Sequence, residues 1–251
     1  MANLDKISRY ISKHLKLDQV TDWTNAMNGL QVANAGNVTK IAAAVDACEA
    51  TIKAAIEEGA DLLLVHHGLF WNGAQPLTGA NYRKYKAAFS NDLAVYSAHL
   101  PLDVHPLLGN NALLFKALGL KKPAPFFFEK GQFIGFKTEV RLHRSELEER
   151  LVQVLGGPVH VCPGGPELIR SVGIVTGGAG GEIKKAASEG VDTFITGEAP
   201  HWAFTGAEEL GMNLFLGGHY ATETFGVKAL AAHLSGKFQI PWTFIDHPSG
   251  L

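Results

Sequence analysis

The chain has 251 residues, of which 46% are hydrophobic, and a formal net charge of -2 at pH 7. This length can bury a sizeable core, in one large domain or in two small, closely packed ones. The near-neutral charge provides no basic face, so electrostatic capture of nucleic acid is not expected. The two cysteines, Cys48 and Cys162, form neither a disulfide framework nor a thiolate metal motif, which fits a reducing cytoplasm.

An amphipathic helix is expected at the start of the chain, over residues 1–17. Leu4, Ile7, Ile11 and Leu15 recur at helical spacing and share one stripe. Charged residues alternate with this stripe, which is not the pattern of a signal peptide, and no later stretch has the length of a transmembrane helix. A membrane partner is therefore not expected.

A strand-helix-strand unit is predicted in the first third of the chain. Residues 41–45 form a short apolar strand, residues 49–58 form a helix that ends at Gly59, and residues 62–65 form a buried strand. This order is typical of a parallel α/β sheet.

Two adjacent histidines, His66 and His67, end this unit. Two imidazoles on the rim of a buried strand are costly to place there, so the pair suggests a metal site. Adjacent residues of a regular strand point to opposite faces, and such a strand could not easily offer both rings to a single ion. At the end of a strand, each ring can turn toward a different ion.

A second unit of the same kind is predicted later, with a strand at residues 171–175, a helix at 182–189 and a strand at 193–196. The two units align without a gap, which indicates an internal repeat, although any two such units share glycines and apolar strands. The identical pairs are Ile52 and Ile183, Lys53 and Lys184, Ala55 and Ala186, Glu58 and Glu189, Gly59 and Gly190, Asp61 and Asp192, and Trp71 and Trp202.

The repeat predicts an α/β fold of two related lobes. Residues 121–125 contain two lysines and two prolines and resemble a linker, so the first lobe is expected over residues 1–122 and the second over 123–251, closely packed and interlinked. Ligands of parallel α/β sheets gather outside the carboxyl ends of the strands. A cleft between the lobes is therefore the expected site.

A second polar segment follows the predicted strand at residues 213–216. His219 and Glu223 are four residues apart at the start of a predicted helix, so their side chains share one face. The pair could bind a metal through one imidazole and one carboxylate. Alternatively, it is a polar first turn in which Glu223 complements the helix dipole.

A third polar segment follows the predicted strand at residues 93–96. It carries His99, Asp103 and His105 in a loop that contains a proline. Taken alone, Asp103 is better interpreted as a turn or N-cap residue, because a helix is expected to begin close behind it.

Together, three strand ends provide histidine or carboxylate, and none provides thiolate. Such a set suits zinc, manganese, iron, cobalt or nickel. Five ligands exceed what one catalytic zinc usually takes from a protein, whereas two divalent ions that share a carboxylate would use them all. The five candidate ligands are His66, His67, Asp103, His219 and Glu223.

Several short motifs occur in a fixed order along nearly the whole chain. They are Asn28-Gly29-Leu30-Gln31-Val32, His66-His67-Gly68-Leu69-Phe70-Trp71, His99-Leu100-Pro101-Leu102-Asp103, Gly109-Asn110-Asn111, Thr196-Gly197-Glu198, and Gly218-His219 with Glu223. This ordered set resembles the Nif-three-like family, whose members are also called dinuclear metal centre hexameric proteins or GTP cyclohydrolase 1 type 2 homologues.

The resemblance implies two divalent ions per subunit. Matched by motif, His66 and Asp103 would bind one ion, His67 and His219 the other, and Glu223 would bridge them. It further implies two related α/β lobes around the metal pair and a toroidal homohexamer. The chain has no room for the additional domain that some relatives carry between the lobes.

The resemblance also implies a metal-dependent hydrolase that acts on a nucleotide or another small phosphate-bearing substrate. In a GTP cyclohydrolase reaction, hydroxide would attack the purine C8, and His99 or Glu198 would transfer protons. The alternative is a metal-binding scaffold or regulator without catalysis.

Two further features leave their interpretations open. The glycine-rich residues 176–181 could bind an anion, but they match neither the dinucleotide fingerprint nor the Walker A spacing, and a tight turn is favoured. Glu198 and His201 occupy the second lobe's counterpart of the histidine pair region. Each could be an acid or base group beside the metals or a surface residue.

Overall fold

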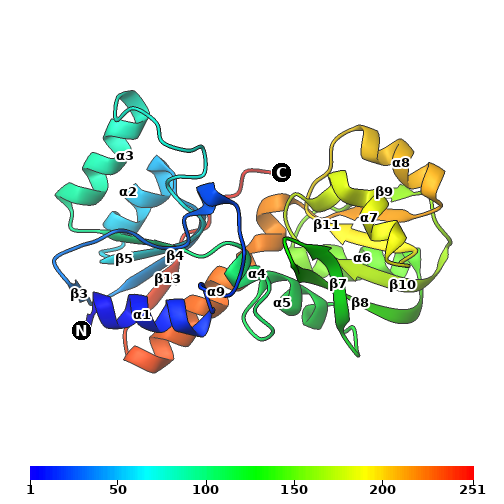
Figure 1. Cartoon of the computed structure of the whole chain (residues 1–251), viewed down its shortest axis with the longest axis horizontal. Coiled ribbons are helices and arrows are strands. Elements are labelled where there is room, and N and C mark those ends of the chain that lie inside the picture. The colour runs from blue at the N-terminus through cyan, green and yellow to red at the C-terminus, as the bar shows by residue number, and fades with distance from the viewer. The chain divides into compact units, whose positions relative to one another are not determined.

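The structure is a computed structural model that describes residues 1–251, and the chain divides into two compact units (Figure 1). The first unit comprises Met1–Leu102 and Gly226–His247, and the second comprises Asp103–Phe225 and Pro248–Leu251. This division differs from the expected boundary at residues 122 and 123. The reason is that helix α5 (Asn110–Ala117) packs against strand β8 (Gln132–His143) of the second unit.

The first unit is built on a five-stranded sheet with the order β13-β4-β5-β6-β2. Its first four strands are parallel, and the edge strand β2 runs antiparallel to β6. The strands are β2 (Gly29–Val32), β4 (Ile41–Asp46), β5 (Leu62–His67), β6 (Ala94–Ser97) and β13 (Trp242–Phe244). The central strands are buried on both faces, which explains their continuous apolar sequences.

Helices cover both faces of this sheet (Figure 1), with α2 and α3 on one face and α1 and α9 on the other. Alternate residues of β4 and β5 pack against α2 and α3 in one apolar cluster. The helices are α1 (Leu4–His14), α2 (Glu49–Glu57), α3 (Gly79–Ser90) and α9 (His219–Phe238), and a short sheet pairs β1 (Ala2–Asn3) with β3 (Asn37–Val38). No helix of the structure combines the length and the apolar character needed to cross a membrane.

The second unit is built on a six-stranded sheet with the order β7-β8-β10-β11-β12-β9. The three central strands are parallel, as in the first unit, whereas β7, β8 and β9 pair antiparallel. The remaining strands are β7 (Ala124–Glu129), β9 (His160–Pro163), β10 (Leu168–Ile174), β11 (Thr193–Thr196) and β12 (Asn213–Leu216), and the helices are α6 (Arg144–Leu155), α7 (Ile183–Ser188) and α8 (Trp202–Leu210). The predicted linker therefore leads directly into an edge strand.

The internal repeat extends to individual hydrogen bonds. Asp61 accepts hydrogen bonds from the backbone N-H groups of Thr39 and Lys40, the latter at 3.2 Å. Asp192 is its counterpart and accepts hydrogen bonds from the backbone N-H groups of Arg170 at 2.9 Å and Ser171 at 3.3 Å. Each carboxylate thus comes directly before one parallel strand and ties it to the neighbouring parallel strand. The same tether at equivalent positions supports the predicted repeat.

Candidate metal centre

The histidine pair lies at the carboxyl end of β5, where its neighbours fix both rings. His66 is fully buried, and its Nδ1-H donates to the carbonyl oxygen of Ala98 at 3.0 Å. His67 donates from Nδ1 to Asp46 Oδ1 at 2.9 Å. With the proton on Nδ1, the lone pair of each ring is on Nε2. A carbonyl or carboxylate on the second ring nitrogen is the usual support of a metal-binding histidine.

His99 is held in the same way by a buried carboxylate. Its Nδ1-H donates to Asp22 Oδ1 at 3.0 Å, and Asn28 donates to the other carboxylate oxygen at 2.7 Å. Burial raises the pKa of Asp22, but hydrogen bonds from His99 and Asn28 and the charge of His99 lower it by more, so the net pKa is below its usual value. Asp22 therefore stays ionised and directs Nε2 of His99 away from itself.

The three imidazoles form one set of donors within the first unit. The ligand-capable nitrogens of His66, His67 and His99 all lie within 4.8 Å of one another. Each ring has its other nitrogen occupied by a separate acceptor, so all three tautomers are fixed. A set of neutral nitrogens held in this way fits the borderline divalent ions expected from the sequence.

Two tryptophans flank this set. The ring centroid of Trp71 lies 4.6 Å from that of His99 and 5.3 Å from that of His67. Trp23 lies 5.8 Å from His99 in an edge-on arrangement. Both indoles are exposed, Trp71 to 38% and Trp23 to 46%, so aromatic surface borders the histidines and remains open to solvent.

In the second unit, His219 is the first residue of α9 and lies between two carboxylates. Its Nε2 is 3.2 Å from Glu223 Oε2, and its Nδ1 is 3.0 Å from Glu198 Oε1. Burial lowers the pKa of His219, but hydrogen bonds to Glu223 and Glu198 and their charges raise it more, to about 9. A positive charge is thus strongly favoured at this position, which a divalent cation would also satisfy.

The glycine-rich segment forms a wall against Glu223. Gly177 has a φ of +74°, and a Cβ on it would lie 2.1 Å from Glu223 Oε1. Its N-H donates to Thr222 Oγ1 at 3.1 Å, and its carbonyl accepts from the N-H of Glu198 at 3.0 Å. Glycine is therefore needed here both for its backbone conformation and for the close approach of the chain to a carboxylate.

Asp103 ends helix α4 (Leu100–Asp103) and is buried. Its Oδ1 accepts a hydrogen bond from Asn110 Nδ2 at 2.8 Å, and Asn111 accepts one from the N-H of Thr176 at 2.8 Å. The residue at the N-cap of α5 is Gly109, so Asp103 does not cap that helix. The two asparagines instead fix the Asp103 carboxylate and the start of the glycine-rich segment.

The structure brings some of the predicted residues together and leaves others outside. His66, His67 and His99 converge in the first unit, and His219, Glu223 and Glu198 converge in the second. His105 instead accepts backbone hydrogen bonds within its own turn, and His201 is exposed at the start of α8. Sequence reasoning missed Asp22 and Asp46. Asp46 ends β4 directly beside His67, a signal that the strand ends contained, whereas Asp22 lies in a loop with no such signal.

Comparison with known proteins decides the family. A model of the family described as Duf34/NIF3 (NGG1p interacting factor 3) matches residues 2–249. The chain belongs to the Duf34/NIF3 family. The resemblance seen in its motifs is thereby confirmed.

Relatives of this Duf34/NIF3 chain match over nearly their whole length. A protein of Deinococcus radiodurans named GTP cyclohydrolase 1 type 2 homolog is 41% identical over 249 residues, covering 98% of this chain and 94% of the relative. A protein of the same name from Haemophilus influenzae is 39% identical over 256 residues, covering 99% of this chain and 100% of the relative.

Solved structures share the fold of this chain. TTHA1606 from Thermus thermophilus has a TM-score of 0.91 and 39% identity, covering 99% of this chain and 100% of that one. HcgD from Methanocaldococcus jannaschii, described in its reduced form, has a TM-score of 0.86 and 27% identity, covering 98% of each chain. The α/β fold expected from the sequence is therefore confirmed.

Proposed function

We propose that this Duf34/NIF3 protein binds two divalent metal ions and uses them to hydrolyse a nucleotide or another small phosphate-bearing substrate. The proposal is carried by His66, His67 and His99, whose Nε2 atoms converge while each Nδ1 is held by a separate acceptor. The first two are proposed as ligands, and His99 lies beside them. The name GTP cyclohydrolase 1 type 2 homolog, carried by relatives that match nearly the whole chain, supports the reaction class.

The proposed ligand sets follow the motifs of the chain. His66 and Asp103 would bind one ion, His67 and His219 would bind the other, and Glu223 would be a ligand of both. The buried Glu223 carboxylate, kept in place by the glycine wall, supports its role as the shared ligand. When bound, such ions supply Lewis-acid activation of water and of a substrate oxygen.

Two residues near these ligands are proposed to have distinct roles. His99, with its Nδ1-H directed to ionised Asp22, can accept a proton at Nε2 and return it, because the carboxylate stabilises the charged ring. Glu198 contacts Nδ1 of His219 and acts as a positioning residue that orients that ligand. The exposed faces of Trp71 and Trp23 suit a planar substrate such as a purine base.

The test compares the parent protein with Glu223→Ala and Asp22→Asn. We expect Glu223→Ala to lose metal, measured by elemental analysis after purification without chelator, and to lose turnover of GTP and of bis(p-nitrophenyl) phosphate. Asp22→Asn should retain metal and lower kcat by about 100-fold, because proton transfer contributes roughly that much.

Two outcomes would contradict the proposal in different ways. A parent protein that contains no metal and takes up neither manganese nor zinc would exclude the metal centre. A parent protein that binds metal in full but turns over no tested substrate, with Glu223→Ala lowering only the melting temperature, would favour the metal-binding scaffold or regulator instead.

A further inference from the structure

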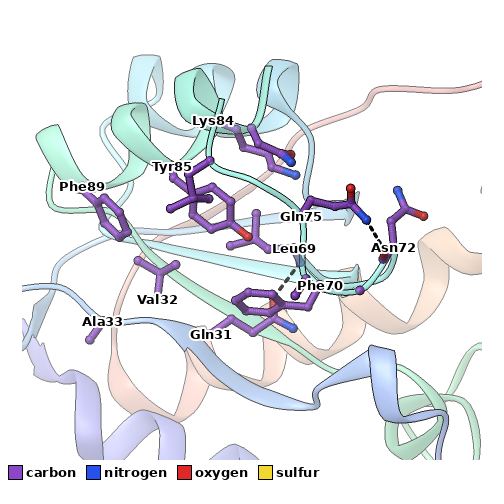
Figure 2. A pocket seen from close by; sticks show the side chains of 14 residues that line it. Gln31, Val32, Ala33, Leu69, Phe70, Asn72, Gln75, Lys84, Tyr85 and Phe89 are labelled. Carbon is purple, nitrogen blue, oxygen red and sulfur yellow. Dashed lines mark hydrogen bonds between the residues drawn. The ribbon is translucent and has the colours of Figure 1, made fainter. Parts of the chain in front are cut away.

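A cavity lies in the first unit between helix α3, the edge strand β2 and the segment that follows β5 (Figure 2). Its volume is about 430 Å³, which is within the range of small-molecule sites. None of the residues that line it is a proposed metal ligand. The cavity is therefore a feature of the fold that the proposed function does not use.

The floor of the cavity is fixed by Gln31 on β2, which uses both ends of its amide group. Its Nε2 donates to the carbonyl oxygens of Ala26 and Met27 at 3.2 and 3.0 Å, and its Oε1 accepts from the N-H of Leu69 at 2.7 Å. A Cβ on Gly68 would lie 2.3 Å from this amide. The wall is thus formed before any ligand binds, which lowers the entropic cost of binding.

Three aromatic rings line the cavity. The ring centroid of Tyr85 lies 6.3 Å from that of Phe70 and 6.2 Å from that of Phe89. Burial raises the pKa of Tyr85, so its hydroxyl stays neutral and can donate a hydrogen bond. Rings at this spacing provide apolar surface that a flat molecule can contact.

Lys84 is the only charged residue that lines the cavity. It is half-buried on α3, and no carboxylate forms an ion pair with it. Apart from the Tyr85 hydroxyl, the other polar side chains of the lining are amides, and two of these, Gln75 and Asn81, already donate to backbone carbonyl oxygens. A half-buried ammonium group beside aromatic rings, with no acid to neutralise it, favours an anionic ligand.

We propose that this cavity binds a small aromatic anion, with its ring against Phe70 and Tyr85 and its acidic group at Lys84. Figure 2 shows Lys84 and Tyr85 extending from α3 on the side of the cavity opposite Gln31 and Phe70. Contacts of the ligand ring with Phe70 and Tyr85 supply most of the binding affinity. The ammonium group of Lys84 favours ligands that carry a negative charge. A carboxylate, sulfonate or phosphate meets this requirement equally well.

The experiment measures binding of 2-naphthoate and of its neutral counterpart, 2-naphthamide, by isothermal titration calorimetry. We expect Lys84→Gln to weaken 2-naphthoate roughly fivefold to tenfold and to leave 2-naphthamide unchanged, since one ion pair of this kind is worth about 1 kcal/mol. Lys86→Gln is the matched control. It removes an exposed lysine of the same helix that does not line the cavity, and it should change neither affinity.

A second variant tests the location directly. Ala33→Trp places a large ring in the cavity from an exposed position and should abolish binding of both probes, with folding checked by circular dichroism. The proposal is overturned if the parent protein binds neither probe at millimolar concentration, or if Lys84→Gln binds 2-naphthoate as the parent does. It is also overturned if Ala33→Trp still binds either probe. A third contrary result is that the affinity of the parent protein for both probes falls as its concentration rises, because a second copy of the chain then covers the cavity.

Discussion

The histidine nitrogens that are proposed to bind metal owe their direction to neighbouring residues that are not proposed ligands. His67 is the clearest case, because Asp46 holds its Nδ1 from the neighbouring parallel strand at the same register. The carboxylate fixes the tautomer and the orientation of the ring. Metal affinity should therefore depend on this acid even though it is not a proposed ligand.

Replacing Asp46 with asparagine tests this dependence. Asparagine retains an oxygen that can accept from Nδ1 but removes the charge, so we expect metal affinity to fall about 10-fold to 100-fold. Competition with a chromophoric chelator provides the measurement. Asp92→Asn is the control, because Asp92 accepts a backbone hydrogen bond from Ala35 and precedes the amino end of β6, whereas the histidines lie at the carboxyl ends of the strands. Equal affinities in the two variants would contradict the role of Asp46.

Gly177 allows a second prediction at the scale of a residue. Gly177→Ala should lose metal binding, because its Cβ would collide with Glu223 at 2.1 Å. Gly131→Ala is a matched control, since Gly131 has a similar φ of +83° with nothing within 4 Å of its Cβ. Both variants should lose roughly 1–2 kcal/mol of unfolding free energy through backbone strain, measured in urea. Only Gly177→Ala should lose metal, and normal metal content in it would show that Glu223 can move aside.

At the scale of elements, α1 and α9 meet through a stack of rings. The centroids of His14 and His233 are 4.6 Å apart with planes 9° from parallel, and the Tyr10 hydroxyl is 2.6 Å from His233 Nε2. Lys237 lies over the Tyr10 ring at 4.4 Å. Burial lowers the pKa of His14, and the charges of His233 and Lys237 lower it further. Protonation of His14 therefore opposes the packing of these two helices.

This stack predicts a loss of stability in acid. The pKa of His14 in the folded chain is below the unfolded value of 6.5, so the unfolded state binds more protons below that pH. The stabilisation is complete above pH 6.5 and decreases as the pH falls through the folded pKa. We expect the melting temperature of His14→Gln to fall less steeply than that of the parent between about pH 7 and pH 5. The exposed His247→Gln is the control, and parallel curves for His14→Gln and the parent would contradict the prediction.

The sequence predicted the parallel strands other than β13, and helices α2, α7 and α9, because apolar runs that end in glycine or in polar residues are local signals. It did not predict β7 and β8, because partly exposed antiparallel strands carry charges such as Lys137, Glu139 and Arg141. Likewise, the histidine pair could be recognised from two adjacent residues. Asp22 could not, because its hydrogen bond to His99 joins positions 77 residues apart.

At the scale of the whole molecule, the family resemblance predicts a toroidal homohexamer. Analytical ultracentrifugation should give a single species with six times the 26.9 kDa mass of the chain. The species should keep its mass on dilution to about micromolar concentration, because rings of this kind are stabilised by closure. A monomer or a mixture of sizes that depends on concentration would contradict the hexamer.

The paired tethers of Asp61 and Asp192 have an evolutionary consequence. Duplication of one ancestral segment would leave such a pattern, since both copies would retain the same structural anchor. The two units differ at the strand ends, where one has His66 and His67 and the other has Gly197 and Glu198. A single-copy ancestor would have had to place the same residues in both halves of a symmetric dimer. A chain that contains both halves lets each carry its own residues.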